Sequence, residues 1–318
     1  MTNAHTKRNG LLLASPWIIG MGLFTLYPFG ASIYYSFTDF SVLQKPVFIG
    51  LDNYRGIAGD SLFWTALKNT LAYAAMAVPL GLFVSLTLAL LMNAARKGQA
   101  FYSAIFYLPH LIPATVAAVL WFWILEPEFG LLNNALRPIF DVLNWLRTSF
   151  DPTLADRMRQ DPNLIWSPPA WMGSTTWALP ALVLMALWNT GQTTFIYLAK
   201  LKDVPQELYE AAEIDGANTW QKIWHVTLPQ ISPVIFFNVI MAIIWSFQVF
   251  AEPFIMTKGT GSPANATLLM PHFIYNSAFR DMHMGYASAL AWILFMIILG
   301  LTALAFRASR GRVHYAAK

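Results

Sequence analysis

Residues 286–306 read YASALAWILFMIILGLTALAF, a run of 21 residues without a formal charge. A helix of this length, rising about 1.5 Å per residue, matches the hydrocarbon core of a bilayer, which is ~30 Å thick. A helix on the surface of a soluble protein carries charged and polar residues along one face, and this run offers no charged face. The stretch therefore predicts a transmembrane helix.

Five further apolar runs extend this prediction to an all-α integral membrane protein with about six transmembrane helices. The composition agrees, because 57% of residues are hydrophobic and 11% are charged, whereas soluble domains average ~45–50% apolar and ~25% charged. We interpret residues 1–318 as a single transmembrane domain with a long outer loop over residues 126–176. The predicted spans cover residues 11–35, 63–92, 101–125, 177–199, 234–256 and 286–306.

The distribution of Lys and Arg predicts that both termini face the cytoplasm. With an inner N-terminus, eleven of these residues fall on inner segments and nine on outer ones. Four of the nine lie in the long outer loop, and long loops contribute little to orientation, so the comparison becomes eleven against five. The inner residues are Lys7, Arg8, Arg96, Lys97, Lys200, Lys202, Lys222, Arg307, Arg310, Arg312 and Lys318.

The first apolar run allows a second interpretation as a cleaved signal peptide, because Lys7 and Arg8 precede it. The run over residues 11–35 is, however, far longer than the ~7–15 apolar residues of a signal peptide. A transmembrane helix is therefore the favoured interpretation.

Residue content excludes several chemistries. The chain has no cysteine, which excludes disulfides, thiolate chemistry and cysteine-based metal sites. No basic run of five or more residues occurs, so we predict no nucleic-acid partner. The histidines at positions 110, 225, 272 and 283 show no ligand spacing, and we predict no metal and no cofactor bound by this chain. The G-x-x-x-x-G-K-[ST] pattern of a phosphate-binding loop is also missing from the sequence.

The inner loop between the fourth and fifth predicted spans, residues 200–231, reads KLKDVPQELYEAAEIDGANTWQKIWHVTLPQI. Pro205 suits the first turn of a helix, and Gly216 supplies the permissive backbone that ends it. Asn218 offers an N-cap oxygen to a second short helix, with a glutamine three residues later in the capping-box position. Pro229 restricts the residue before it to an extended conformation, so we expect the second helix to end there. On physical grounds alone, an ordinary amphipathic interfacial loop is the alternative to a functional segment.

The spacing within this loop resembles the EAA loop of permease subunits of binding-protein-dependent ABC importers. The family pattern is E-A-A, three residues, G, nine residues, a branched apolar residue, one residue, and L-P. Here Glu210-Ala211-Ala212 precedes Gly216 at the family spacing, and Val226 stands where Ile is more usual, before Leu228-Pro229.

Other segments resemble the carbohydrate-type subfamily, which includes the maltose and glycerol-phosphate permeases. They are the FIGLDNY run at 48–54, Asn69-Thr70, Leu108-Pro109 and the GYASA run at 285–289. One departure lies at the outer end of the fifth span, where family members often carry F-D and then T-x-G-G-P. This chain has FAEP at 250–253 and TKGTGSP at 257–263, which leaves the solute less defined than the family.

The resemblance implies a type I ABC importer permease with a cytoplasmic coupling helix, located in the inner (cytoplasmic) membrane of a bacterium or archaeon. Such a subunit is not an enzyme and moves a sugar or oligosaccharide by alternating access; a polyol or a glycerol phosphate ester is the alternative cargo. The implied partners are a second permease subunit in a heterodimer, two ATPase subunits that bind ATP and Mg²⁺, an extracytoplasmic solute-binding protein and membrane lipid. The residues that the resemblance assigns to ATPase coupling are Glu210, Ala211, Ala212, Asp215, Gly216, Ala217, Leu228 and Pro229.

Polar residues inside the predicted spans are candidates for the solute pathway, because polar groups facing lipid are costly. Asn238, Trp245 and Glu252 recur every seven residues, so on a continuous helix they fall within about 40° of one another. Amide and carboxylate groups can bond sugar hydroxyls while an indole packs against an apolar ring face. The alternative is that these groups bond neighbouring helices or the partner permease. The full candidate set is Asn189, Gln192, Asn238, Met241, Trp245, Gln248 and Glu252.

Three other classes of membrane protein fit parts of this pattern. A secondary transporter also places polar residues within its spans, but it needs no inner loop of this spacing. A membrane enzyme needs paired carboxylates, a histidine cluster or an activated nucleophile at membrane depth, and the sequence shows none of these. A structural assembly subunit leaves the polar residues of the fifth span unexplained. The importer permease is therefore the favoured prediction.

Overall fold

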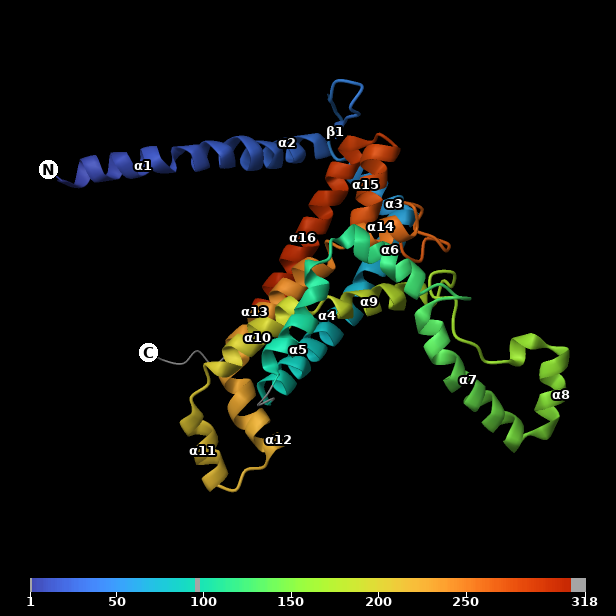
Figure 1. The fold of residues 1–318 in the computed structure, drawn as a ribbon. Coiled ribbons are helices and arrows are strands. Elements are labelled where there is room, and N and C mark those ends of the chain that lie inside the picture. Colours follow the sequence, from blue (N-terminus) through green and yellow to red (C-terminus); the bar gives the residue numbers. More distant parts are fainter. Residues whose placement is uncertain (1, 95–97, 310–318) are drawn as a thin grey trace. The chain divides into compact units, whose positions relative to one another are not determined.

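A computed structural model describes residues 2–94 and 98–309 of the 318-residue chain, and these residues are mainly helical (Figure 1). They form two compact units, residues 1–64 with 273–297 and residues 65–272 with 298–318. Part of the charge pattern used for orientation falls outside the described residues, namely Arg96, Lys97, Arg310, Arg312 and Lys318.

The first unit begins with a continuous helical segment and a short hairpin. The segment comprises α1 (Thr2–Met21), the π-helical turn η1 (Gly22–Leu26) and α2 (Tyr27–Ser36). Strands β1 (Thr38–Asp39) and β2 (Val47–Phe48) then pair antiparallel, with Thr38 opposite Phe48. The rest of the unit consists of α3 (Asp52–Gly59), the start of α4 (Ser61–Ala94), the end of α15 (Met270–Tyr275), the π-helical turn η5 (Asn276–Arg280) and most of α16 (Met284–Ser309).

Two segments that resemble the carbohydrate-type permeases hold this unit together. The side-chain amide of Asn53 donates hydrogen bonds to the carbonyl oxygens of Ser36 and Thr38, each at 2.9 Å. A side chain at Gly285 would overlap the carbonyl of Thr38, so only glycine lets the start of α16 approach the hairpin. The hydroxyl of Tyr286 donates to a carboxylate oxygen of Asp60 at 2.7 Å.

The second unit contains most of the helices. Along the chain these are most of α4, α5 (Gln99–Tyr107), the 3₁₀ turn η2 (Leu108–Leu111), α6 (Ala114–Ile124), α7 (Leu131–Phe150), α8 (Pro152–Gln160), the 3₁₀ turn η3 (Pro162–Leu164), α9 (Ala178–Trp188), α10 (Gly191–Lys202), α11 (Gln206–Ile214), α12 (Thr219–Lys222), the π-helical turn η4 (Ile223–Thr227), α13 (Leu228–Ser246) and α14 (Ala251–Met256). One buried cluster joins α4, α6 and α9 through Tyr73, Trp121 and Leu182. A second joins α4, α10 and α13 through Met92, Leu198 and Ile231.

The predicted third span, residues 101–125, is not one straight helix. The segment 99–111 meets α6 at an angle of 101°. Ile112 lies at the break with ψ of 125°, because the ring of Pro113 disfavours a helical conformation of the residue before it. Because residues 101–125 are uniformly apolar, their hydrophobicity does not indicate the bend.

The predicted fourth span, residues 177–199, is also interrupted. Helix α9 ends at Trp188 and α10 begins at Gly191. A side chain at position 191 would overlap the backbone carbonyl of Phe106, so glycine is required where α10 approaches α5.

The predicted fifth span, residues 234–256, differs at both ends. Its helix begins earlier, because α12, η4 and α13 run on from Thr219 without an interruption. It ends earlier as well, since α13 stops at Ser246 and α14 starts at Ala251. Pro253 explains the second difference: proline lacks the N–H that a continuing helix needs, but the first turn of a new helix does not need it.

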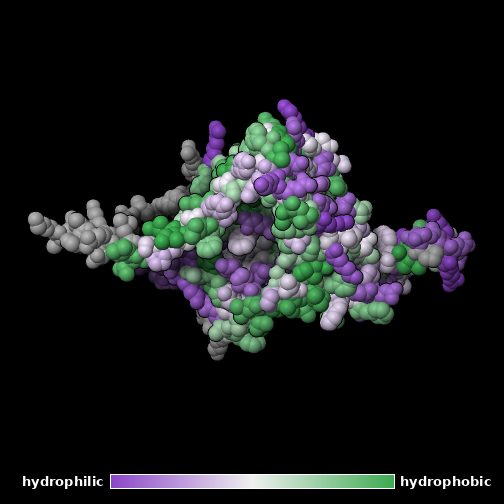
Figure 2. All heavy atoms as spheres, turned by 90° about the horizontal axis from the view of Figure 1, so that it is seen from above, coloured by the Kyte–Doolittle hydropathy of each residue, from purple (hydrophilic) through white to green (hydrophobic). Residues whose placement is uncertain are grey.

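Four described helical segments are long and apolar enough to cross a membrane: Leu12–Ser36, Ser61–Ala94, Thr219–Met256 and Met284–Ser309. The bent pair of the third predicted span makes five if it crosses as one unit. The chain is therefore a mainly helical membrane protein, and the count of six spans stays a prediction. Figure 2 shows hydrophobic and hydrophilic side chains interspersed on the face seen from above, with mainly hydrophilic ones at the end formed by α8. The many large apolar side chains that are exposed are stable in lipid, whereas each Å² of apolar surface left in water forfeits about 25 cal/mol.

Candidate functional site

The candidate coupling segment consists of α11 and α12 with the turn between them. Helix α11 begins at Gln206, and Pro205 is its N-cap with ψ of 130°, so the proline lies one residue before the helix rather than in its first turn. Glu207 in the first turn complements the positive end of the helix dipole. The prediction of a short helix ending before Gly216 is confirmed.

Backbone hydrogen bonds lock the end of α11. The N–H of Ala217 donates to the carbonyl of Ala212 at 2.9 Å, and the N–H of Gly216 donates to the carbonyl of Glu213 at 3.0 Å. This pair of bonds is a Schellman motif, which needs a left-handed residue after the helix. Gly216 supplies it with φ of 78°, and the space around its α-carbon is open, with no other atom within 4 Å of where a β-carbon would lie. The glycine is thus required by backbone conformation and not by crowding.

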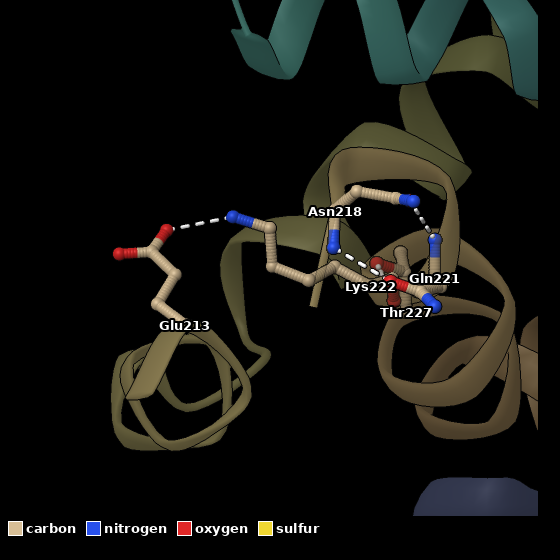
Figure 3. A network of polar contacts seen from close by, with 5 residues as sticks. All are labelled: Glu213, Asn218, Gln221, Lys222 and Thr227. Atoms are coloured by element: carbon tan, nitrogen blue, oxygen red, sulfur yellow. Dashed lines mark hydrogen bonds and ion pairs between the residues drawn. The ribbon is translucent and has the colours of Figure 1, made fainter. Parts of the chain in front are cut away.

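A capping box starts α12, as the sequence predicts (Figure 3). The side chain of Asn218 accepts from the N–H of Gln221 at 3.0 Å, and the side chain of Gln221 accepts from the N–H of Asn218 at 2.8 Å. Two of the N–H groups at the start of the helix are therefore satisfied without a partner protein.

Side chains tie the two helices into one unit. Figure 3 shows Lys222 reaching back to Glu213, and the two charged groups are 2.6 Å apart. The hydroxyls of Tyr209 and Thr227 lie 3.0 Å apart, which joins α11 to the π-helical turn. The segment therefore forms a defined surface, in contrast to a loose interfacial loop.

The predicted end of the second helix at Pro229 is wrong. Leu228 is helical, with φ of −62° and ψ of −42°, and its N–H donates to the carbonyl of Ile223 five residues earlier. The wider π-helical turn accommodates the proline, whose ring would clash with the carbonyl of His225 in a regular α-helix. The coupling segment is thus joined to the membrane helix by continuous helix, without a flexible linker.

The exposed surface of the segment combines acidic and apolar groups. Glu210, Asp215 and Gly216 are exposed, while Ala212, Ala217, Leu228 and Pro229 are partly buried. Three large apolar side chains that the predicted set omits also face outward: Ile214 is 87% exposed, Trp220 72% and Trp224 63%. Apolar anchors surrounded by polar groups are typical of a protein–protein interface. The apolar character of positions 214 and 220 was readable from the sequence, but their exposure was not.

The candidate pathway residues lie in different environments. Asn238 is buried on α13 close to Tyr197 of α10. The approach of the two side chains lacks the geometry of a hydrogen bond, so the side-chain nitrogen of Asn238 has no hydrogen-bond partner among the described residues. Met241 is partly buried, whereas Trp245 is 62% exposed. These three lie on one continuous helix, as the prediction assumed.

The rest of the fifth-span set does not share that helix. Gln248 lies in the break after Ser246, and Glu252 belongs to α14. The angle derived for a continuous helix is therefore wrong for Glu252, and the role of both residues in a pathway stays a prediction.

The two candidates of the fourth span lie on either side of its interruption. Asn189 is exposed and its side-chain oxygen lies 3.2 Å from Nδ1 of His110, a contact that the sequence did not indicate. Gln192 lines a shallow groove of about 390 Å³ with Tyr107 and Phe195. Within residues 2–94 and 98–309 no three His, Asp or Glu side chains form a group that could hold a metal ion.

The described residues thus combine apolar helices long enough to cross a membrane with an exposed α11–α12 segment that is held by its own hydrogen bonds. Residues 77–309 match the family described as binding-protein-dependent transport system inner membrane component, and the chain belongs to this family of ABC transporter permeases. The chain is similar to the probable ABC transporter permease protein YesP of Bacillus subtilis, with 37% identity over 97% of this chain and 93% of the relative. It is also similar to the lactose transport system permease protein LacF of Rhizobium radiobacter, with 30% identity over 96% and 95%.

A solved structure shares the fold. The bacterial alginate ABC transporter, in complex with a periplasmic protein that holds an alginate pentasaccharide, contains a chain that matches with a TM-score of 0.76. The match covers 96% of this chain and 95% of the other at 23% identity. The architecture is therefore that of an ABC importer permease.

Proposed function

We propose that this chain is the membrane-spanning subunit of an ATP-driven importer that passes a sugar or oligosaccharide from an external binding protein into the cytoplasm. The observation that carries this proposal is the α11–α12 segment, because its backbone is locked internally and its acidic and apolar side chains remain free for a partner. The names of the relatives LacF and the alginate transporter support a carbohydrate cargo.

The partner at this surface is an ATPase subunit in the proposal, with two such subunits binding ATP and Mg²⁺. Glu210, Asp215 and the exposed Ile214 would enter a groove on that subunit. Because η4 joins the segment to α13 by continuous helix, closure of the ATPase pair would move the membrane helices as rigid bodies and alternate access to the solute. The chain itself is non-catalytic in this scheme and pairs with a second permease subunit in the cytoplasmic membrane.

The solute would meet polar groups in this chain that carry no positive charge. Asn238, Trp245 and Gln248 offer amides and an indole. Glu252 offers a carboxylate, and residues 223–256 carry no Lys or Arg that would attract an anion. A glycerol phosphate ester or a polyol is the second candidate cargo, because a partner permease can supply the missing cation. The lack of a cation in this chain favours the sugar.

The test is uptake by the importer reconstituted in vesicles with its own partner subunits, external binding protein and internal ATP. We expect uptake of a labelled sugar from a panel of monosaccharides, oligosaccharides, polyols and glycerol 3-phosphate, and no uptake without ATP. Glu210→Lys should abolish uptake while leaving membrane insertion intact, and Lys202→Glu on the neighbouring exposed surface serves as a control for a changed charge. ATP-independent uptake, or normal uptake by the Glu210→Lys variant, would contradict the proposal.

A further inference from the structure

Helix α7 carries an apolar stripe along its whole length. Its members recur at spacings of four, four, three, four and four residues, so at about 100° per residue they lie within about 100° of arc. None of them is charged or polar. The stripe consists of Leu131, Ala135, Ile139, Val142, Leu146 and Phe150.

The apolar stripe of α7 is exposed, whereas a soluble amphipathic helix buries its apolar side. On the stripe, Ile139 is 56% exposed, Val142 55% and Phe150 88%. On the opposite side, Asn133 is buried and Asn144 and Arg147 are partly buried. A helix that folds against its own protein in water buries the apolar side and exposes the polar one.

The chain itself covers part of the polar side, at Asn144 and Arg147, and leaves Arg137 and Asp141 exposed. The side-chain amide of Asn144 donates to the carbonyl of Trp166 at 2.8 Å, and its oxygen accepts from the N–H of Trp166 at 3.0 Å. Arg147 donates to the carbonyl of Leu164 at 2.9 Å, and its guanidinium lies 4.0 Å from the centre of the Trp166 ring. The segment around Leu164 and Trp166, which returns along α7, thus fixes the helix with its stripe directed away from the rest of the unit.

The start of α7 is held at the end of a membrane helix. Trp171 donates from its indole to the side-chain oxygen of Asn133 at 2.7 Å, and Asn133 donates to the carbonyl of Pro127 at 3.0 Å. Leu132 packs against the buried cluster that contains Leu125, directly after α6. The helix therefore starts where the chain leaves the membrane, on the predicted outer face, and Figure 1 shows it running away from α4 and α5.

We propose that α7 lies in the membrane–water interface, with its stripe inserted into the outer leaflet and its polar side toward water. Arg137, Asp141 and Arg147 keep it from spanning, and it is not among the helices long and apolar enough to cross. Trp145, Trp166 and the Arg147 stacked on an indole are the residue types that gather at such an interface.

A transient protein partner fits the stripe less well than lipid does. Transient protein interfaces are about as apolar as the rest of a protein surface and are enriched in Tyr and Arg at their centres. The stripe is aliphatic over five of its six positions and has no hydrogen-bonding side chain. This inference rests on the membrane location of the chain and not on its solute or on ATPase coupling.

The absence of cysteine from the chain allows a direct test. Single variants Val142→Cys and Leu146→Cys on the stripe, and Arg137→Cys and Asp141→Cys on the polar side, are spin-labelled in the assembled importer in vesicles of phosphatidylethanolamine and phosphatidylglycerol. Relaxation by oxygen, which concentrates in lipid, is compared with relaxation by a water-soluble nickel chelate. We expect oxygen to dominate at 142 and 146 and nickel to dominate at 137 and 141.

Two results would overturn the proposal. Nickel accessibility at 142 and 146 equal to that at 141 would place the stripe in water, and exclusion of both reagents there would show that a protein covers it. If a stripe variant does not assemble, Ala135→Cys replaces it, because this small exposed residue belongs to the same stripe. Sugar uptake by the unlabelled variants, measured in parallel, reports separately on the proposed function.

Discussion

Replacing Gly216 tests the backbone conformation of the α11–α12 turn without changing the exposed side chains of the segment. The residue has φ of 78°, and no atom beyond Gly216 and its two chain neighbours lies within 4 Å of the place that a β-carbon would occupy. Gly216→Ala therefore introduces no clash, and its cost is conformational, about 1–2 kcal/mol for a left-handed residue with a side chain. Gly216→Asn should cost less, because asparagine tolerates the left-handed region.

These conformational costs predict graded losses of affinity between the permease and the ATPase. Each 1.4 kcal/mol corresponds to about a tenfold change in an equilibrium constant. If the ATPase binds only the segment with an intact turn, Gly216→Ala should weaken binding by up to about thirtyfold and Gly216→Asn by less. Gly216→Pro should abolish transport with membrane insertion intact, because proline cannot adopt the positive φ and loses the N–H that bonds the carbonyl of Glu213.

The assay is ATPase affinity for the permease in nanodiscs, together with uptake per ATP hydrolysed in vesicles. Gly50→Ala is the matched control, because Gly50 has φ of 64°, is equally uncrowded and lies in the hairpin region of the first unit. We expect the affinity of the ATPase to fall from wild type through Gly216→Asn and Gly216→Ala to Gly216→Pro. The Gly50→Ala control should bind the ATPase as wild type does. Equal affinity of the alanine and glycine forms would refute the requirement for a locked turn.

Further predictions concern the segment, the pathway and the outer arm. Reversing the charge of Lys222 or of Glu213 alone should increase hydrogen exchange in the α11–α12 turn, and the double reversal should restore protection. Because the Glu213 side chain is 62% exposed, each single reversal should cost about 1 kcal/mol, although the Lys222 side chain is partly buried. Asn238→Leu should leave the thermal unfolding temperature unchanged or raise it, because it removes a buried amide nitrogen without a partner, yet it should raise KM for the sugar if the amide contacts solute; a lower unfolding temperature would instead indicate a structural role. The Thr153 hydroxyl, which donates to Asp151, holds the pKa of that carboxyl below its usual value. The carboxylate cap of α8 should therefore be intact above pH ~4 and be lost as the pH falls through the lowered pKa, with Asp151→Asn retaining and Asp151→Ala losing amide protection of the first turn at neutral pH.

Local backbone chemistry explains which parts of the fold could be predicted. The Schellman turn at Gly216 and the capping box at Asn218 depend only on residues within one turn of each other, so their spacing in the sequence is sufficient. The apolar runs likewise reveal membrane helices because hydrophobicity over a whole span outweighs local detail.

Other features depend on contacts that no local pattern contains. The rule that proline ends a helix failed at Pro229, because a π-helical turn changes the position of the carbonyl that the ring would meet. The interruption before Gly191 arises where α10 meets the backbone of Phe106, far away in sequence. The contact between Asn189 and His110 joins two such distant segments, and neither residue alone signals it.

The stripe of α7 is present in the sequence as a regular helical spacing of apolar residues, although it lies inside the predicted outer loop. The direction in which the stripe faces could not be inferred, because it is set by the hydrogen bonds from Asn144 and Arg147 to the returning chain.

Cross-linking of the coupling segment to the ATPase tests the central claim most directly. Ile214→Cys places a unique thiol at a side chain that is 87% exposed, and Leu43→Cys places one at an 82% exposed side chain of the hairpin region. With a short bifunctional maleimide and single cysteines on the ATPase surface, we predict a cross-linked permease–ATPase product from position 214, loss of ATP-driven sugar uptake on cross-linking, and neither effect from position 43. Absence of a product from position 214 in a complex that transports normally, or equal products from both positions, would contradict the account.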